Sequence, residues 1–293
     1  DLDPSDVKSY RPISNLSVIS KLLERIVSSQ LVDYLKTHGL LPRLQSAYLP
    51  YHSTETAVLK VISDILFALD SGDLAMLTLL DLSAAFDSVD HATLIKRLRT
   101  SYGLSCTVID WFASYLSDRT ECVRTAGSSS APLPVWFGVP QGSVLGPILF
   151  LLYTADLISL IEHHRLTPHA FADNTQIYGS CSPSHADELR ERTSACIDAV
   201  YSWMAANRLQ LNQAKTEVLW CTSSRRLNQI PTGPVRIGGT QVQPVSTVRD
   251  LGVMLDADLT FRTHVTSTVR ACFAALRRIR SVKRSLPRSC LLR

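Results

Sequence analysis

HAFADNTQIY, residues 169–178, places a polar pair between two apolar flanks, and it decides the fold more than any other stretch. Asn and Asp tolerate positive φ, so an Asp-Asn pair between such flanks predicts a β-hairpin with a two-residue loop. We therefore expect Asp173 and Asn174 to form that loop. The alternative is that the pair forms a turn with no further role, and a second carboxylate beside it would argue against this alternative.

A second carboxylate follows a buried strand earlier in the chain. Residues 75–80 (AMLTLL) form a nearly continuous apolar run of strand length, which indicates a strand buried on both faces, and Asp81 comes directly after it. Two such strands can lie side by side in one sheet and hold a divalent cation jointly. Magnesium is commonly bound by one or two protein carboxylates, with water and substrate phosphates completing its shell.

The third informative segment is GVPQGSVLGP, residues 138–147, ahead of an apolar run. Its glycines and prolines predict an unusual backbone path that approaches a ligand closely, with a helix starting near Ser143 or Pro147. Free amide groups at a helix start favour contact with phosphate or a base. A glycine-rich loop alone is weak evidence, but this one lies between the two carboxylate segments.

The three segments resemble motifs A, B and C of reverse transcriptases, in the order of that family. Residues 10–14 (YRPIS), 211–217 (LNQAKTE) and 251–253 (LGV) resemble the first fingers motif and motifs D and E of the non-LTR (LINE-type), jockey-like branch. The resemblance covers about residues 8 to 265. It implies an α+β right-hand polymerase fold with helical fingers, an antiparallel-sheet palm and the beginning of a thumb.

The resemblance also implies a division of the chain. We expect fingers over 1–74, motif A of the palm over 75–91, a fingers and palm insertion over 92–137, palm motifs B, C and D over 138–222, the motif E hairpin over 223–260, and a truncated thumb over 261–293. Apolar spacing of three and four predicts helices over about 16–35, 54–69, 186–207 and 261–280. Because the chain opens with Asp1 and ends in the thumb, we expect it to be partial.

The activity implied by the resemblance is RNA-directed DNA synthesis, with two Mg²⁺ ions, or Mn²⁺ as a substitute, transferring a nucleotide to a primer 3′-hydroxyl. Asp81 and Asp173 would hold both ions, with the Leu82 carbonyl as a further ligand and Asn174 as an auxiliary one. Lys215 would neutralise or protonate the departing pyrophosphate. Without the resemblance, Lys215 is equally well explained as a surface lysine at the start of a strand.

The resemblance assigns binding roles to further residues. Arg11 and Lys21 would hold the triphosphate, although a lysine on a helix face is usually only solvated. Phe86 would act as a sugar gate that collides with a ribose 2′-hydroxyl, or would be an ordinary core phenylalanine. The floor under the incoming base pair and the support of the primer strand would come from Gln141, Gly142, Leu251 and Gly252.

One position departs from the family pattern, because active members carry a second aspartate where this chain has Asn174. Three hypotheses follow: an active RNA-directed DNA polymerase, an impaired or inactive remnant that only binds nucleic acid, and an RNA-dependent RNA polymerase. Phe86 disfavours the third, since such enzymes need room for the 2′-hydroxyl. The expected partners of an active enzyme are an RNA template, a DNA primer, deoxynucleoside triphosphates, and the element RNA as a ribonucleoprotein.

Composition agrees with an intracellular module, and the resemblance implies that it works in the nucleus or in a cytoplasmic ribonucleoprotein. The 293 residues are 45% hydrophobic, and the seven cysteines have no CxxC spacing, which argues against a zinc site or disulfide framework. We expect no membrane association, because the apolar tract over 144–155 is too short to span a bilayer. From residue 277 onward basic residues occur without acidic ones, so Arg277 and Arg278 would lie along a phosphate backbone or on a solvated helix face.

Overall fold

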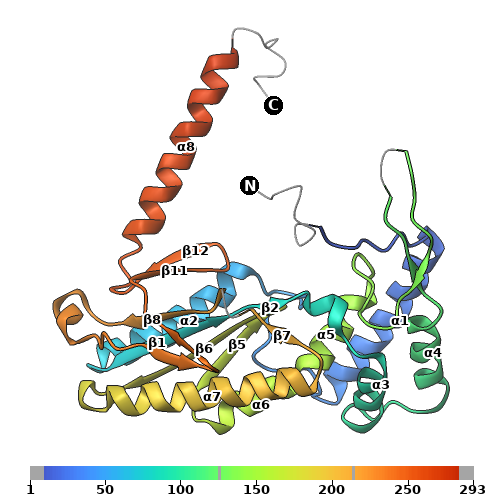
Figure 1. The fold of residues 1–293 in the computed structure, drawn as a ribbon, viewed down its shortest axis with the longest axis horizontal. Helices are drawn as coiled ribbons and strands as arrows, with labels where there is room; N and C mark the ends of the chain where they lie inside the picture. The colour runs from blue at the N-terminus through green and yellow to red at the C-terminus, as the bar shows by residue number, and fades with distance from the viewer. Residues whose placement is uncertain (1–9, 125–126, 213–214, 284–293) are drawn as a thin grey trace.

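A four-stranded antiparallel sheet forms the centre of the fold in this computed structural model, which describes residues 10–124, 127–212 and 215–283. The strand order is β5 (Thr167–Phe171), β6 (Asn174–Cys181), β1 (Leu74–Leu80) and β8 (Glu217–Cys221). The apolar run predicted as a strand is β1, and it pairs with a neighbour on each side. The expected mixture of helices and antiparallel strands is confirmed (Figure 1).

Alternating side chains of β1 build two hydrophobic cores, one on each face of the sheet. Leu74, Met76 and Leu80 face a large core that includes α5 (Leu145–Thr154) and α7 (Ala186–Ala206). Ala75 and Leu77 face a smaller core formed with α2 (Thr54–Asp70) and the hairpin of β11 (Thr247–Asp250) and β12 (Val253–Asp256). Because successive strand residues point to opposite faces, a continuous apolar strand is required between two covered faces.

Other helices gather at one end of the sheet or project from it (Figure 1). The helices α1 (Val18–Thr37), α3 (His91–Thr100) and α4 (Cys106–Leu116) lie together at that end, whereas α6 (Asp156–His163) lies beside α7. The last helix, α8 (Arg262–Val282), extends away from the sheet and has no buried residue. The helices predicted from apolar spacing correspond to α1, α2, α7 and α8, with boundaries within a few residues.

Short strand pairs and 3-10 turns connect these elements. The pairs are β2 (Leu82–Ser83) with β7 (Gln210–Leu211), β3 (Thr120–Glu121) with β4 (Leu133–Pro134), β9 (Val235–Ile237) with β10 (Thr240–Val242), and β11 (Thr247–Asp250) with β12 (Val253–Asp256). The 3-10 turns are η2 (Ala85–Ser88), η3 (Pro183–His185) and η5 (Ser224–Gln229).

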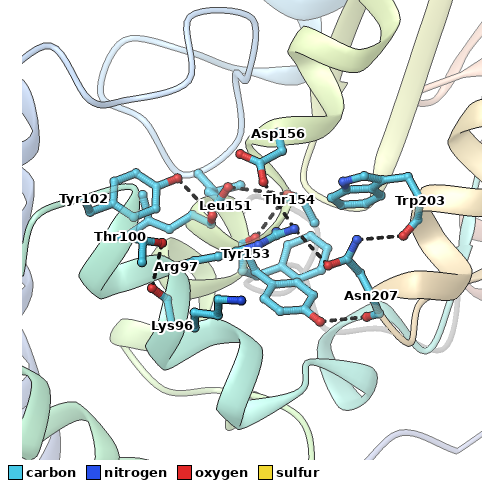
Figure 2. A network of polar contacts seen from close by, with 12 residues as sticks. Lys96, Arg97, Thr100, Tyr102, Leu151, Tyr153, Thr154, Asp156, Trp203 and Asn207 are labelled. Atoms are coloured by element: carbon cyan, nitrogen blue, oxygen red, sulfur yellow. Dashed lines mark hydrogen bonds and ion pairs between the residues drawn. The ribbon is translucent and has the colours of Figure 1, made fainter.

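A polar cluster around one buried arginine ties several helices together (Figure 2). Arg97 of α3 donates to Asn207 Oδ1 at 2.9 Å, pairs with Asp156 at 3.3 Å, and lies over the rings of Tyr153 and Trp203. Asn207 in turn donates from Nδ2 to the Trp203 carbonyl at 2.7 Å. We call these five residues the Arg97 cluster. It joins α3, α5, α6 and α7 through one guanidinium group.

The apolar tract proves longer than expected, because α6 follows α5 with only Ala155 between them. Together they give one segment, Leu145–His163, that is long and apolar enough to cross a membrane by length and composition alone. The argument from length is therefore wrong. However, 56% of that window is buried inside the protein, and a core helix meets the same criterion.

Candidate active site

The hairpin of β5 and β6 differs by one residue from the expected turn. Phe171 pairs with Asn174, so the two-residue loop is Ala172 and Asp173, and Asn174 begins β6. The prediction that Asp173 and Asn174 form the loop is therefore wrong. Ala172 takes the positive φ, at +56°, and its N–H donates to Gln45 Oε1 at 3.1 Å. The turn is therefore held by a contact from the distant loop that carries Gln45, and the preference of Asn for positive φ does not decide which residues form it.

Asp81 and Asp173 lie near each other at the ends of β1 and the hairpin. The last registered pair of β1 with β6 is Leu80 with Thr175, and Asp81 comes next. Burial raises the pKa of Asp173, and the negative charge of Asp81 raises it further, whereas Arg11 and Lys215 lower it. Two half-buried carboxylates held close together form a site that favours a cation.

An open pocket joins four of the predicted residues. It has a volume of about 410 Å³ and is lined by Asp81, Asn174, Lys215 and Leu251, together with Gln176, Glu217, Arg249 and Asp250. Lys215 Nζ lies 2.8 Å from Asp81 Oδ2, and the lysine side chain is 64% exposed. We call Asp81, Asp173, Asn174 and Lys215 the Asp81 cluster. Of the segment 211–217, Gln213 and Ala214 lie outside the described residues.

The oxygen donors of the Asp81 cluster fit a hard divalent cation. In the described part of the chain, no three His, Cys, Asp or Glu side chains form a group able to hold a metal ion. The available set is therefore two carboxylates, from Asp81 and Asp173, and the amide oxygen of Asn174. Mg²⁺ accepts such a sparse protein shell when phosphates and water supply the other ligands. Leu82, directly after Asp81, is buried and pairs with Leu211.

The glycine-rich segment packs tightly against the residues that follow Asp81. Gly138 has a φ of +91°, and a Cβ there would lie 2.9 Å from the Cα of Asp87. Gln141 Nε2 donates to both carboxylate oxygens of Asp87, at 2.7 and 2.9 Å, so its amide group is held by that residue. Helix α5 begins at Leu145, between the two expected starts. Gly142, with a φ of +87°, lies next to the Ser14 carbonyl.

Phe86 lies in η2, half-buried in a row of aromatic rings. Its ring stacks on Phe150 with centroids 4.4 Å apart and meets the edge of Tyr48 at 6.5 Å. Burial raises the pKa of Tyr48, and the charge of Asp173 raises it further, so the Tyr48 hydroxyl is close enough to Asp173 for the two groups to interact. Sequence analysis did not identify Tyr48, whose φ of +59° is also unusual for a non-glycine residue.

Sequence analysis also missed Glu24, a buried carboxylate on α1. Its Oε2 accepts from the main-chain N–H groups of Val144 and Leu145, at 2.7 and 3.1 Å, at the start of α5. A carboxylate there satisfies free amide groups and the positive end of the helix dipole. The sequence did contain a signal, because Glu24 shares the inward spacing of Leu31 and Leu35 on the same helix.

The remaining predicted residues lie at different distances from this site. Leu251 and Gly252 form the loop of the β11–β12 hairpin, with φ of +44° and +96°, and Leu251 reaches the pocket. The strand that follows this loop begins at Val253. Lys21 is exposed on α1. Arg277 and Arg278 are exposed on α8, which projects away from the sheet (Figure 1), so the structure does not bring them to the Asp81 cluster.

Comparison with known proteins identifies the family. Residues 3–255 match the family model described as reverse transcriptase (RNA-dependent DNA polymerase). The chain is 33% identical over 280 residues to the probable RNA-directed DNA polymerase from transposon BS of Drosophila melanogaster, covering 93% of this chain and 30% of that protein. It is 30% identical over 272 residues to the RNA-directed DNA polymerase from mobile element jockey of Drosophila funebris, covering 90% and 28%. The chain thus spans under a third of these relatives.

Solved structures agree on the fold. An apo telomerase from Candida tropicalis, truncated from its C-terminal domain, superposes with a TM-score of 0.55 at 14% identity, covering 82% of this chain and 44% of that one. A second apo telomerase structure from the same organism gives a TM-score of 0.55 at 12% identity, with 82% and 40% covered. The expected polymerase fold and the resemblance to jockey-like elements are both confirmed. The chain belongs to the reverse transcriptase family, with polymerases of non-LTR retrotransposons among its relatives.

Proposed function

We propose that this chain is the polymerase part of a non-LTR retrotransposon protein and copies RNA into DNA at the Asp81 cluster. The observation that carries the proposal is the pocket that joins Asp81, Asn174 and Lys215, with the half-buried Asp173 next to Asn174 in the chain. These residues come from three segments far apart in sequence, and they supply the acidic and basic groups that nucleotidyl transfer needs.

Asp81 and Asp173 would hold two Mg²⁺ ions, or Mn²⁺ in their place, with the Leu82 carbonyl and the Asn174 amide oxygen as further donors. When bound, such ions lower the pKa of a primer 3′-hydroxyl and stabilise the charge on a departing pyrophosphate. Lys215 pairs with Asp81 in this structure but is mostly exposed. Its side chain can therefore turn toward a negatively charged product.

The nucleotide would lie between the Asp81 cluster and the aromatic row. Stacking on Phe150 fixes the Phe86 ring, and a fixed ring at the sugar position would exclude a 2′-hydroxyl. Arg11, whose charge lowers the pKa of Asp173, would hold the triphosphate. The duplex would be bound through shape and backbone charge, without base recognition, because a polymerase accepts every sequence. Leu251, Gly252, Arg277 and Arg278 would contact the primer and template. Gln141 and Gly142 would form the floor under the incoming base pair, and Lys21 would contact the triphosphate.

A second candidate function is nucleic-acid binding without synthesis. Asn174 lines the pocket where the family carries a second aspartate, so the site lacks one negative charge beside the proposed ions. Asn retains a carbonyl oxygen that can bind a hard cation, but more weakly than a carboxylate. In either case we propose that the protein works inside the cell, in the nucleus or in a cytoplasmic ribonucleoprotein with the element RNA.

Primer extension on an RNA template with deoxynucleotides and Mg²⁺ separates these candidates. We expect the parent chain to extend the primer, Asn174→Asp to extend it faster, and Asp81→Asn to abolish extension. Synthesis by Asn174→Asp with none by the parent would establish the binding-only function for this chain. If neither protein extends a primer that both bind, the polymerase proposal fails. Incorporation of ribonucleotides as fast as deoxynucleotides would contradict only the role of Phe86 and would leave the polymerase proposal intact.

A further inference from the structure

Asp250 is a buried carboxylate that the proposed chemistry does not use. It is the last residue of β11, is 3% exposed, and lines the same pocket as Asp81. Gln176 Nε2 donates to its Oδ1 at 2.6 Å, and among the described residues its Oδ2 has no hydrogen-bond partner. Burial raises the pKa of Asp250 to about 6. Burying an ionisable carboxyl group lowers the stability of the folded state, so a buried Asp250 in this pocket indicates a role other than stability.

The contact with Gln176 is the end of a longer chain of hydrogen bonds. Gln176 Oε1 lies 2.8 Å from His169 Nδ1, and His169 Nε2 lies 3.0 Å from Ser46 Oγ. All four side chains are buried. We call Ser46, His169, Gln176 and Asp250 the polar chain.

The chemistry of these groups fixes the direction of every bond in the polar chain. The carboxylate of Asp250 accepts from the Gln176 amide, so Gln176 Oε1 must accept from His169 Nδ1–H. Burial lowers the pKa of His169, which keeps the ring neutral and leaves Nε2 to accept from the Ser46 hydroxyl. Each donor therefore points toward Asp250, and the bonds polarise one another in the same sense.

The polar chain connects the three parts of the site that must keep a fixed geometry. Ser46 lies in the loop before α2, and its N–H donates to the Ala170 carbonyl of β5 at 2.9 Å. His169 and Gln176 are paired across the hairpin whose loop carries Asp173. Asp250 directly precedes the Leu251 and Gly252 loop. Main-chain hydrogen bonds from Val245 to Val218 and from Thr222 to Ala257 hold the open end of the β11–β12 hairpin to β8 and the residue after it, whereas Gln176 holds the end that carries the loop.

We propose that Gln176 and Asp250 are positioning residues that set the Leu251 and Gly252 loop relative to the Asp81 cluster. A primer end supported by that loop then meets Asp81 and Asp173 in one geometry. The inference rests on the proposed function, because it assigns the loop to the primer. It differs from a purely structural role in one respect: the hydrogen bond between Gln176 and Asp250, rather than packing, determines where the primer end lies.

Exchange of the two groups tests this directly. Gln176→Glu at about pH 8.5 places two ionised carboxylates against each other and breaks the bond. Adding Asp250→Asn restores the bond with its direction reversed, because the new amide at position 250 donates to the new carboxylate at position 176. Asp250→Asn alone keeps an oxygen for Gln176 to donate to. A primer with 2-aminopurine at its 3′ end reports its position by fluorescence, without requiring catalysis.

We expect Gln176→Glu to change the 2-aminopurine signal and to lower the rate of single-nucleotide addition about tenfold, the effect of losing one charged hydrogen bond, with an unchanged KM for the nucleotide. The double variant and Asp250→Asn should both return to the parent values. Tyr178→Phe is the matched control. Tyr178 lies on β6 two residues after Gln176, and the substitution removes the hydrogen bond that its hydroxyl donates to Asp64 of α2. It should lower thermal stability without moving the primer end.

Two outcomes would overturn the inference. One is a double variant that stays as impaired as Gln176→Glu, and the other is a Tyr178→Phe variant that shifts the primer end equally. Fluorescence anisotropy of the labelled primer and template keeps the two proposals apart. A chain that binds no primer and template refutes the proposed function, whereas normal binding with an unchanged 2-aminopurine signal in Gln176→Glu refutes only the positioning role.

Discussion

The Arg97 cluster and the Asp81 cluster contain the same kinds of side chain but differ in their exposure to solvent. Each contains one basic side chain, a paired aspartate and an asparagine. The Arg97 side chain is only 12% exposed, and its contacts go to an amide oxygen, a carboxylate and two aromatic rings of the same chain. The Lys215 side chain is 64% exposed and makes its ion pair with Asp81 alone among the described residues. One cluster is closed, and the other is open to a ligand.

This difference shows how the fold separates stability from function. A largely buried cation held by an amide oxygen and a carboxylate stabilises the helices that supply these groups, because breaking the contacts leaves buried groups unpaired. A half-exposed ion pair contributes little to stability, and a buried carboxylate beside a like charge lowers it. Mutations in the Arg97 cluster should therefore change the free energy of unfolding, and mutations in the Asp81 cluster should change activity.

The largest expected effect tests the open cluster. Asp173→Asn should lower primer extension at least about 1,000-fold, since ion binding at such a site is worth several kcal/mol in the transition state. Extension is measured in the parent or in Asn174→Asp, whichever synthesises DNA. Stability should move in the other direction. The folded state raises the pKa of Asp173, so the carboxylate becomes destabilising as pH rises through the unfolded and then the folded pKa.

The pH dependence provides the control for this prediction. Asp173→Asn removes the ionisable group, so the variant should unfold at a higher urea concentration than its parent at about pH 7.5. Below about pH 4, where the carboxyl group becomes protonated in both states, the two midpoints should converge. A variant less stable than its parent near neutral pH would show that Asp173 has a structural role like that of Arg97.

The next effect tests the closed cluster. Arg97→Met should lower the free energy of unfolding by about 2 to 3 kcal/mol, because the buried Asn207 oxygen loses its donor and two rings lose a cation. Urea denaturation followed by tryptophan fluorescence measures the change. Primer extension below the unfolding transition should stay within about twofold of the parent, since no residue of this cluster lines the pocket.

Lys96→Met supplies the matched control on the same helix. Lys96 is an exposed neighbour whose main-chain carbonyl accepts from Thr100, and the substitution keeps that contact. It should change stability by less than about 0.5 kcal/mol. Equal losses in the two variants would mean that α3 is sensitive to any change in charge, and that the contacts shown in Figure 2 are not the reason.

The two clusters differ also in how far sequence alone could predict them. Asp81 and Asp173 were predictable because each follows or divides an apolar strand, and strand pairing brings such ends together. The Arg97 cluster was not, because Arg97 and Asn207 are 110 positions apart and each is unremarkable in its own segment. The same reason hides the contact of Gln176 with Asp250, which are 74 positions apart.

Local preference failed where a distant contact competes with it. Asn at positive φ is the common solution for a short hairpin, and that rule predicted the loop at Asp173 and Asn174. In the structure Gln45, from a loop 127 positions away, binds both the N–H and the carbonyl of Ala172, and the positive φ lies one residue earlier. Gln45 reaches Ala172 because its loop pairs with β5 at Ala170, and that tertiary contact cannot be predicted from the local sequence of the hairpin.

The smallest effect follows from that displaced turn and separates strain from charge in the open cluster. Ala172→Gly relieves a positive φ that costs an L-residue about 1 kcal/mol, but it also frees the unfolded chain, so stability should change by less than about 1 kcal/mol. Extension should fall, by less than about tenfold, because a glycine lets Asp173 sample other orientations. Steady-state rates and urea midpoints measured together check both expectations. Unchanged extension would mean that the hydrogen bonds of Gln45, and not the conformation of residue 172, hold Asp173 in place.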